Sequence, residues 1–243
     1  MTATFAVDLR SDTVTRPTPA MRRAMAEAEV GDDGFGDDPT TNRLCATFAE
    51  LVGKEAALFL PSGTMANQVA IRCLAEPGTT VIAGRRHHVV THEGGAFGVN
   101  QVAQLQAVDD GDGTLDPAEV ALLDEGAAHG WPRPSLVCVE NTHLASGGRP
   151  WPLERLRAVA AVGVPVHQDG ARLFNAMVAA GVSAADYAAP SLTVTACLSK
   201  GLGAPLGSLL AGPAEVMARA RHERKRLGGG MRQVGFVAAA GLV

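Results

Sequence analysis

The sequence predicts an α/β protein built on a doubly wound, mostly parallel sheet. Short apolar segments of strand length alternate with longer amphipathic segments, a pattern typical of parallel sheets with crossover helices. Aromatic residues make up 4% of the 243 residues and glycine occurs 28 times, which indicates a core of small aliphatic side chains between tight turns. Because no repeat or linker divides the chain, we expect residues 1–243 to form a single large domain.

Four helices are predicted from proline, glycine and periodicity signals. A proline in the first turn opens the first helix, and Gly53 ends the second. The predicted helices are Pro19–Glu29, Asn42–Val52, Met65–Leu74 and Pro152–Val162. An acidic, glycine-rich loop over Gly31–Pro39 separates the first two.

Six apolar runs are predicted as buried strands because each is short, partly β-branched and bounded by turn residues. They are Ala56–Leu60, Thr80–Ala83, Gln101–Ala107, Leu136–Glu140, Pro165–Asp169 and Leu192–Leu198. A loop over Tyr187–Pro190 is expected before the last strand.

Charge, hydropathy and cysteine content exclude several classes of protein. The net charge of −4 and the pI near 6.0 provide no basic surface for nucleic acid. No apolar run reaches the length of a membrane span, and Met1–Asp12 has no secretory signal pattern. Four scattered cysteines form neither a CxxC motif nor a disulfide framework. We therefore predict a cytoplasmic globular protein.

Three polar groups fall where predicted strands end: Ser62-Gly63-Thr64, Asp169-Gly170-Ala171-Arg172 and Ser199-Lys200-Gly201. Ligands of parallel sheets bind beyond the carboxyl ends of the strands. A Gly-Thr turn that opens a helix offers N–H groups and a hydroxyl to a phosphate. An acid and a lysine at other strand ends suit a basic ring nitrogen and an aldehyde. Pyridoxal 5'-phosphate carries all three groups, so we predict it as the cofactor.

Other ligands fit the sequence less well. The run Gly201–Gly207 imitates a dinucleotide fingerprint, but Pro205 interrupts it and no acid follows at about 20 residues. The acidic segments Asp32–Asp38 and Asp109–Asp112 lack the terminal glutamate of a calcium loop, so we interpret them as solvated turns.

Two further patterns indicate neither a nucleic-acid partner nor a metal site. The basic run Arg219–Arg226 is interrupted by Glu223 in a chain that is acidic as a whole. Seven histidines occur without HxxxH or CxxC spacing, so no metal site is predicted. Four of them are expected to be structural or exposed, namely His87, His92, His167 and His222.

Seven segments, in order along the chain, give the sequence a resemblance to a known family. They are Asp8–Thr15, Gly31–Thr40, Pro61–Asn67, Glu140–His143, Asp169–Arg172, Leu198–Gly203 and Gly228–Gln233. Any one tetrapeptide is weak evidence, whereas seven in order are specific. In these segments the chain resembles the low-specificity threonine aldolases, within the fold-type-I (aspartate-aminotransferase-like) class of pyridoxal-phosphate enzymes.

The resemblance implies a role for five residues at the cofactor. Lys200 matches the lysine that forms the Schiff base, and Asp169 matches the partner of the ring nitrogen. Gly63 and Thr64 match the turn that binds the phosphate. His88 matches the histidine that stacks on the pyridine ring.

Five more residues receive roles in the same way. Ser11 and Arg172 match groups that hold the substrate carboxylate, with Arg172 also at the cofactor. Lys225 and Arg232 match basic residues that reach the phosphate from a neighbouring subunit, which implies a homodimer or homotetramer with a shared site. His129 stands where the family has a second active-site histidine.

The chain also departs from the family pattern. Phe35 stands where many relatives have tyrosine, Leu144 replaces an asparagine, and Gln168 replaces an apolar residue. The sequence stops at Val243, where the resemblance leads us to expect a small C-terminal domain with a second carboxylate-binding arginine. We therefore expect a cofactor-binding large domain that is a poor catalyst or none.

The resemblance implies retro-aldol cleavage of threonine or allo-threonine to glycine and acetaldehyde, a step of threonine catabolism and glycine biosynthesis. The base that accepts the β-hydroxyl proton is His88, His129 or a bound water. Two alternatives stay open: another pyridoxal-phosphate β-eliminating lyase or aminotransferase with the same lysine and aspartate, or an inactive truncated remnant.

Overall fold

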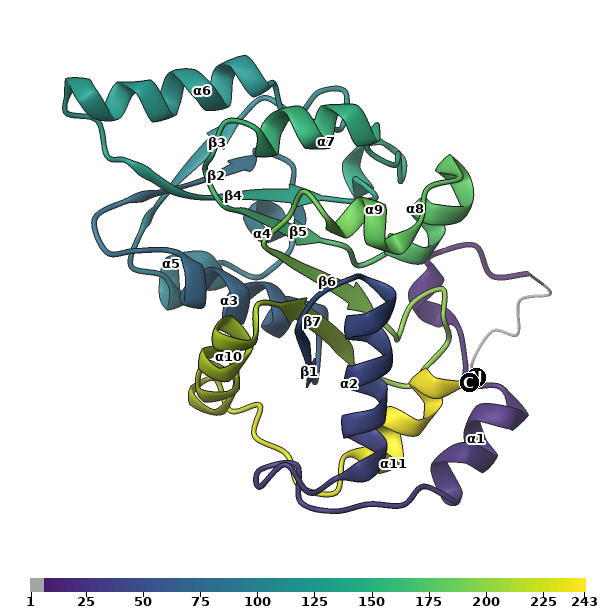
Figure 1. Ribbon diagram of the computed structural model, residues 1–243. Helices are drawn as coiled ribbons and strands as arrows, with labels where there is room; N and C mark the ends of the chain where they lie inside the picture. Colours follow the sequence, from purple (N-terminus) through teal and green to yellow (C-terminus); the bar gives the residue numbers. More distant parts are fainter. Residues whose placement is uncertain (1–6) are drawn as a thin grey trace.

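The computed structural model describes residues 7–243, which fold around a seven-stranded sheet (Figure 1). The strands are β1 (Ala56–Leu60), β2 (Thr80–Gly84), β3 (Gln104–Val108), β4 (Pro134–Glu140), β5 (Val166–Asp169), β6 (Thr193–Cys197) and β7 (Ser208–Gly212). Half of the segment Met1–Asp12, in which no secretory signal is predicted, lies outside the described residues.

The sheet has the order β1-β7-β6-β5-β4-β2-β3. Strand β7 is antiparallel to both of its neighbours, β1 and β6, while all other neighbouring pairs are parallel. The predicted α/β class with a mostly parallel sheet is therefore confirmed. The sequence analysis missed β7 because its glycine-rich approach, Gly201–Gly207, resembles a ligand-binding turn and its pairing partners lie far away in the chain.

Some helices connect successive strands, and the others lie before the first strand or after the last strand of the sequence (Figure 1). The α-helices are α1 (Pro19–Ala26), α2 (Pro39–Leu51), α3 (Gly63–Leu74), α4 (His88–Thr91), α5 (Ala96–Asn100), α6 (Pro117–Glu125), α7 (Leu153–Ala160), α8 (Leu173–Ala180), α9 (Ala184–Ala188), α10 (Ala214–Arg226) and α11 (Gly235–Ala238). Short 3-10 helices are η1 (Asp12–Val14), η2 (Gly126–His129), η3 (Leu144–Ser146) and η4 (Ala239–Leu242).

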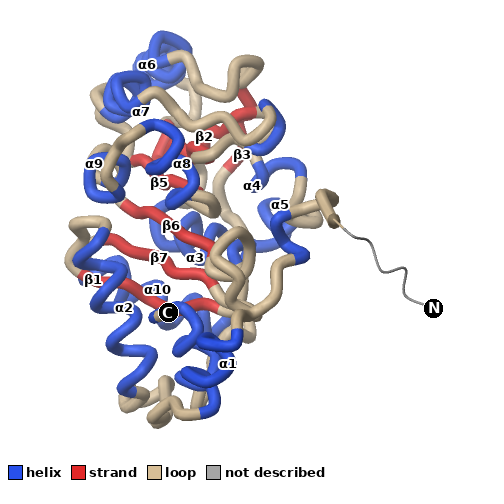
Figure 2. Tube along the Cα trace, turned by 90° about the vertical axis from the view of Figure 1, so that its right-hand side faces the viewer, coloured by secondary structure: helices blue, strands red, loops and turns tan. Residues whose placement is uncertain are grey.

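Helices cover both faces of the sheet, which passes through the centre of the molecule in Figure 2. Successive strand side chains point to opposite faces. Phe59 accordingly belongs to the same buried cluster as Phe48 of α2 and apolar residues of α7 and α8, whereas Leu58 and Leu60 belong to a second cluster with Val69 of α3 and apolar residues of α10. The doubly wound arrangement follows from this division of the core.

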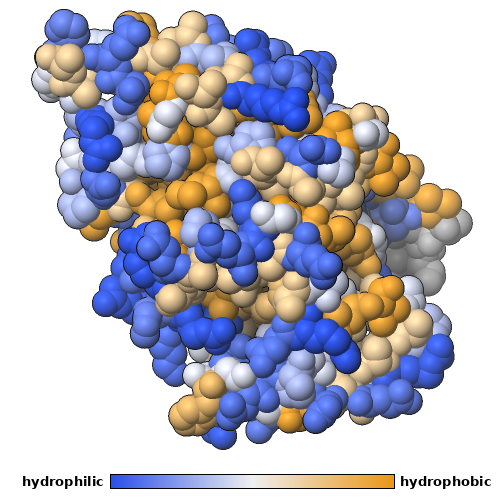
Figure 3. Space-filling model, in the orientation of Figure 1, coloured by the Kyte–Doolittle hydropathy of each residue, from blue (hydrophilic) through white to orange (hydrophobic). Residues whose placement is uncertain are grey.

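The surface mixes polar and apolar side chains. Figure 3 shows hydrophilic side chains over much of one face, with apolar ones gathered between them. Across residues 7–243, no helix is long and apolar enough to cross a bilayer.

The interpretation of the two acidic segments as solvated turns is wrong for three of their residues, because Asp33, Asp38 and Asp110 are buried. Asp38 caps α2 and also accepts a hydrogen bond from the backbone N–H of Gly235 at 2.9 Å. Asp33 forms a buried ion pair with Arg224. Partners distant in sequence thus compensate these carboxylates for the loss of water.

The predicted loop Tyr187–Pro190 is also partly wrong. Tyr187 and Ala188 belong to α9 and are buried, and the Tyr187 hydroxyl donates to the carbonyl oxygen of Trp151 at 2.9 Å. The basic run Arg219–Arg226 forms the end of α10, where Arg224 points into the protein.

Candidate active site

The three polar groups that follow predicted strands lie at one edge of the sheet. Strands β1, β5 and β6 run in the same direction, so Ser62, Asp169 and Lys200 follow carboxyl ends that face the same way. The Asn67 side chain of α3 donates to the Asp169 carboxylate at 2.7 Å, and both Asp169 and Lys200 lie close enough to His88 to affect its pKa. The structure therefore brings the predicted lysine, aspartate and helix-opening turn together.

The first turn of α3 has the features of an anion site. Ser62 caps the helix by accepting a hydrogen bond from the N–H of Met65, and Gly63 and Thr64 supply the next backbone N–H groups. The hydroxyl of Ser208 lies 3.5 Å from the point that a side chain on Gly63 would occupy. Among the described residues this buried hydroxyl has no hydrogen-bond partner. A buried unpaired donor beside a helix N-terminus fits a phosphate.

Asp169 is held rigidly at the end of β5. Its side chain is 5% exposed. One carboxylate oxygen accepts from Asn67 and the other accepts from the backbone N–H of Ala171 at 3.0 Å. Both contacts come from neutral donors, so the carboxylate keeps its negative charge available for a cationic partner.

A second buried carboxylate, Glu140, ends the neighbouring strand β4 and is in register with Asp169. Its oxygens accept the backbone N–H groups of His88 at 2.6 Å and Leu144 at 2.8 Å. Burial, and then the charge of Asp169, raise the pKa of Glu140 to about 7. Glu140 therefore joins the start of α4 to the loop that follows β4.

His88 begins α4 beside these carboxylates. Its Nδ1 lies 3.0 Å from Oε1 of Glu93, and its ring stacks on that of His92 with centroids 5.6 Å apart. The hydrogen bond to Glu93 raises the pKa of His88, and the nearby charge of Asp169 adds to this effect.

His88, Glu93 and Asp169 approach one another closely enough to suggest a metal site, since ligand atoms of all three lie within 4.8 Å of each other. The Asn67 amide nitrogen, however, donates to both carboxylates, at 2.9 Å to Glu93 and 2.7 Å to Asp169. A hydrogen-bond donor between the two carboxylates occupies the position that a cation needs. The cluster is therefore a hydrogen-bond network.

The N-terminal segment closes one side of the site. The Thr15 hydroxyl donates to the carbonyl oxygen of Lys200 at 2.6 Å. Ser11 caps η1, its hydroxyl oxygen accepting from Thr13. Arg172 donates to both oxygens of Asp12, from Nε at 2.6 Å and from Nη2 at 2.8 Å. The hydrogen bond from Arg172 lowers the pKa of Asp12. The Arg172 guanidinium, which the sequence analysis assigns to binding of the substrate carboxylate, is thus paired with a carboxylate of the chain itself.

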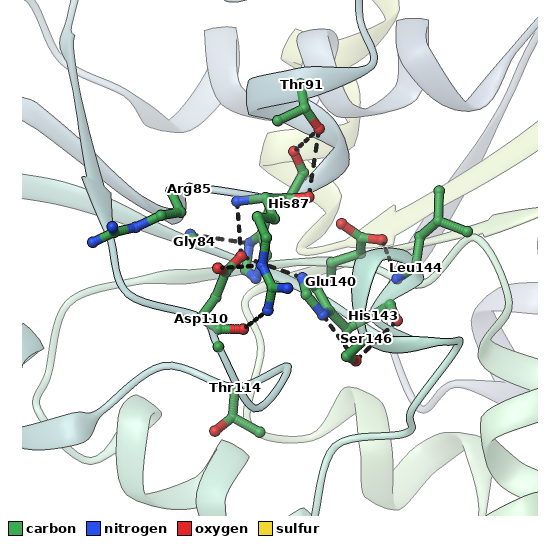
Figure 4. A network of polar contacts seen from close by, with 12 residues as sticks. Gly84, Arg85, His87, Thr91, Asp110, Thr114, Glu140, His143, Leu144 and Ser146 are labelled. Carbon is green, nitrogen blue, oxygen red and sulfur yellow. Dashed lines mark hydrogen bonds and ion pairs between the residues drawn. The ribbon is translucent and has the colours of Figure 1, made fainter.

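A second polar cluster lies at the start of α4, around the residues that precede this helix (Figure 4). The buried rings of His87 and His143 lie 5.2 Å apart, and Nε2 of His143 is 3.2 Å from Oδ2 of Asp110. Arg86 donates to the same carboxylate from its backbone N–H at 2.8 Å and from its side chain at 3.1 Å. These contacts fix the loop that precedes α4.

The spacing of His87, Asp110 and His143 also meets the distance for a metal cluster. The backbone N–H of Gly84 donates to Nδ1 of His87 at 3.2 Å, so the neutral ring carries its proton on Nε2. A histidine that binds a metal through Nε2 needs the opposite arrangement, with Nδ1 as donor. Together with the Arg86 guanidinium on Asp110, this tautomer makes the cluster a hydrogen-bond network as well.

Three predicted site residues lie elsewhere. His129 is exposed in η2, before the amino end of β4, whereas Glu140 and Asp169 lie at carboxyl ends. Lys225 and Arg232 line a groove of about 470 Å³ that also includes Phe35 of the acidic loop. Within the described part of the chain, this groove shares no lining residue with the group around Lys200.

The sequence analysis gave no role to four residues that organise the site: Asp12, Asn67, Glu93 and Glu140. Three of them stand inside the seven family-like segments, and Glu93 follows His88 by five residues. The signal available in the sequence was that these polar residues stand in or near the same motifs as the residues that were given roles.

Comparison with known proteins finds one matching family model and several relatives of similar sequence. The family model for beta-eliminating lyases matches residues 8–243. The chain is 46% identical over 245 residues to low-specificity L-threonine aldolase 1 of Arabidopsis thaliana, covering 98% of this chain and 68% of that protein. It is also 46% identical over 241 residues to the low specificity L-threonine aldolase of Escherichia coli K12, covering 97% and 72%.

Another relative is an uncharacterized protein of Caenorhabditis elegans, 47% identical over 241 residues. The chain spans 58% of the length of that protein. Solved structures of a Leishmania major threonine aldolase and of a putative L-allo-threonine aldolase from Listeria monocytogenes share the fold, with TM-scores of 0.81 and 0.80. Both are 23% identical, and this chain covers 70% and 63% of their lengths.

Proposed function

This chain belongs to the beta-eliminating lyase family, and on that premise we propose that it cleaves β-hydroxy-α-amino acids with pyridoxal 5'-phosphate as cofactor. The proposed substrates are threonine and allo-threonine, and the products are glycine and acetaldehyde. The names of relatives that are 46% identical support this reaction. The chain spans only part of the length of those proteins. We therefore propose that this chain is the cofactor-binding large domain and that it carries out the reaction in that form.

The observation that carries the proposal is the set of groups at one sheet edge that match the cofactor. Gly63 and Thr64 at the start of α3, with the buried hydroxyl of Ser208, would hold the phosphate. Asp169, fixed by neutral donors, would face the ring nitrogen, and Lys200 would receive the aldehyde. When bound, pyridoxal phosphate supplies an aldehyde that captures amines and a ring that withdraws electrons from the substrate.

Proton transfer falls to His88 in this arrangement. A neutral imidazole accepts a proton from a β-hydroxyl, and the raised pKa of His88 makes it a stronger base. His129, the other candidate histidine, lies toward the opposite edge of the sheet within this chain. The negative charge of Asp169 favours positive charge opposite it, which is the state in which the ring withdraws electrons best.

Binding of the substrate carboxylate is assigned to Arg172 and Ser11. Arg172 already donates to Asp12, so an incoming carboxylate must share the guanidinium or displace Asp12. The guanidinium has five N–H donors, and the two contacts with Asp12 leave three for a second partner. Ser11 stands next to Asp12 in the chain, so it lies beside the same guanidinium.

The proposal includes a homodimer or homotetramer with shared sites. Lys225 and Arg232 line an open groove beside Phe35, whose side chain is 83% exposed. A basic groove with an exposed aromatic residue suits contact with the phosphate end of a neighbouring subunit's site. Four free cysteines, at Cys45, Cys73, Cys138 and Cys197, favour the reducing cytoplasm.

The test is turnover of threonine and allo-threonine by the purified chain supplied with pyridoxal phosphate. Glycine and acetaldehyde in equal amounts support the proposal, whereas pyruvate with ammonia would instead assign an eliminating lyase. Borohydride reduction followed by peptide mapping should label Lys200 and lose that label in Lys200→Ala. Lys54→Ala is the matched control, because Lys54 bonds to the backbone of Ser191 instead.

A further inference from the structure

Glu93 contacts the histidine to which the proposed reaction gives the proton. It stands in the turn between α4 and α5, and its Oε1 lies 3.0 Å from Nδ1 of His88. Glu93 is 7% exposed, so water does not compete strongly for its carboxylate. A carboxylate on one ring nitrogen of a histidine fixes both the orientation and the tautomer of the ring.

The position of Glu93 is itself fixed by two residues of α3. Asn67 donates to Oε1 at 2.9 Å, and Gln68 donates to Oε2 at 2.7 Å. Gln68 is held in turn by the side chain of Gln101, which donates to its Oε1 at 2.9 Å. The carboxylate therefore cannot rotate away from His88 without leaving buried donors unpaired.

The direction of each hydrogen bond around Asn67 follows from its partners. Glu93 and Asp169 accept only, so both hydrogens of the Asn67 amide point to these carboxylates. The Asn67 oxygen must then accept from Nε2 of His167, at 3.2 Å. It follows that Nδ1 of His167 accepts from the hydroxyl of Thr193, at 2.8 Å.

The same reasoning sets the proton on His88. The Glu93 carboxylate accepts from Nδ1, so in the neutral ring Nδ1 carries the hydrogen and Nε2 has a free lone pair. Because Asn67 joins Glu93 to Asp169, these two carboxylates are held in fixed positions relative to each other.

We propose that Glu93 is the positioning residue that makes Nε2 of His88 the proton-accepting atom. Asn67, in this proposal, holds Glu93 at a fixed position relative to Asp169. This inference rests on the proposed function only where it gives His88 the role of base. The hydrogen bond between Glu93 and His88 is observed independently of that role.

Several charged or titratable groups surround His88 besides Glu93: Asp169, Glu140, Lys200 and His92. The hydrogen bond to Glu93 is the largest contribution that raises the pKa of His88, ahead of Asp169, while burial and Lys200 oppose it. Replacing the Glu93 carboxylate by an amide should therefore lower the pKa of His88 and leave the other groups in place.

The first test uses nitrogen-15 NMR of the histidines in the cofactor-free chain, with His88→Gln to assign the signals. In wild type, neutral His88 should carry its proton on Nδ1, which the different shifts of bare and protonated ring nitrogens reveal. In Glu93→Gln the pKa of His88 should be lower. Glu223→Gln is the control, because Glu223 is a half-buried carboxylate that pairs with Arg72 instead.

Two results would overturn the proposal: a proton on Nε2 of neutral wild-type His88, or the same His88 pKa in Glu93→Gln as in Glu223→Gln. The wild-type tautomer needs no variant, so it decides the question even if Glu93→Gln fails to fold.

The second test is the pH profile of threonine cleavage by the cofactor-loaded chain. Glu93→Gln should shift the acidic limb of kcat to lower pH, in step with the NMR titration, whereas a residue that only supports folding would lower kcat without moving the limb. If neither the wild-type chain nor any variant cleaves threonine or allo-threonine, the proposed function fails. The NMR result then still decides whether Glu93 sets the tautomer of His88.

Discussion

The buried ion pair between Arg224 and Asp33 joins α10 to the acidic loop before α2. Both side chains are 3% exposed. Arg224 donates through Nη2 to Asp33 and through Nη1 to the carbonyl oxygen of Phe59 at 2.7 Å. Arg224→Met keeps much of the side-chain volume but leaves the Asp33 carboxylate and the Phe59 carbonyl without these donors.

Removing one partner of a buried ion pair costs about 3–5 kcal/mol, because the remaining charge is left uncompensated. Arg221 stays 3.7 Å from Asp33 in this variant and compensates part of that charge. We therefore expect the lower end, about 3 kcal/mol, which corresponds to a fall of roughly 6–12 °C in Tm for a chain of this size.

The assay is urea unfolding followed by circular dichroism, at one fixed protein concentration, with Arg133→Met as the matched control. Arg133 pairs with Glu76 at the surface, where the two side chains are 54% and 60% exposed. Exposed pairs contribute about 0–1 kcal/mol. Equal losses of unfolding free energy in Arg224→Met and Arg133→Met would refute the reasoning.

A double variant separates the ion pair from the lost packing. Asp33→Asn combined with Arg224→Met removes both charges, so it should be less destabilising than the sum of the two single variants. Additive losses would show that the two side chains contribute independently.

Three further predictions concern the site. Asp169→Asn should retain bound pyridoxal phosphate, seen by absorbance, but lose most threonine cleavage, because an amide does not stabilise a positive ring nitrogen; near-wild-type turnover would remove Asp169 from that role. Burial raises the pKa of Glu140 from 4.5 to about 7, so the folded state holds a proton that the unfolded state releases. Wild-type unfolding free energy should therefore fall as pH rises through this range, and less so in Glu140→Gln; parallel pH curves in urea unfolding would contradict this. Gly84→Ala places a methyl group 2.6 Å from the carboxylate of Asp110 and from the ring of His87. It should destabilise the fold by about 1–3 kcal/mol, and an unchanged Tm would show that the loop can shift.

The sequence alone predicted the segments whose signals are local. The strand Ala56–Leu60 was predicted with its observed bounds, because an apolar run between turn residues needs no distant partner to be recognised. Helix α2 begins three residues before its predicted start, where Asp38 caps it and Pro39 occupies its first turn. Strand β7 was missed because its identity depends on pairing with β1 and β6, not on its own composition.

The sequence also determined which edge of the sheet carries Asp169 and Lys200, since the carboxyl ends of parallel strands meet on one side. Only the tertiary structure decided how that edge is organised. Asn67 meets Asp169 across 102 positions of sequence, and Arg172 meets Asp12 across 160. Contacts of this kind depend on the direction of each side chain and on which buried donors remain to be satisfied, and both are set when the strands and helices pack together.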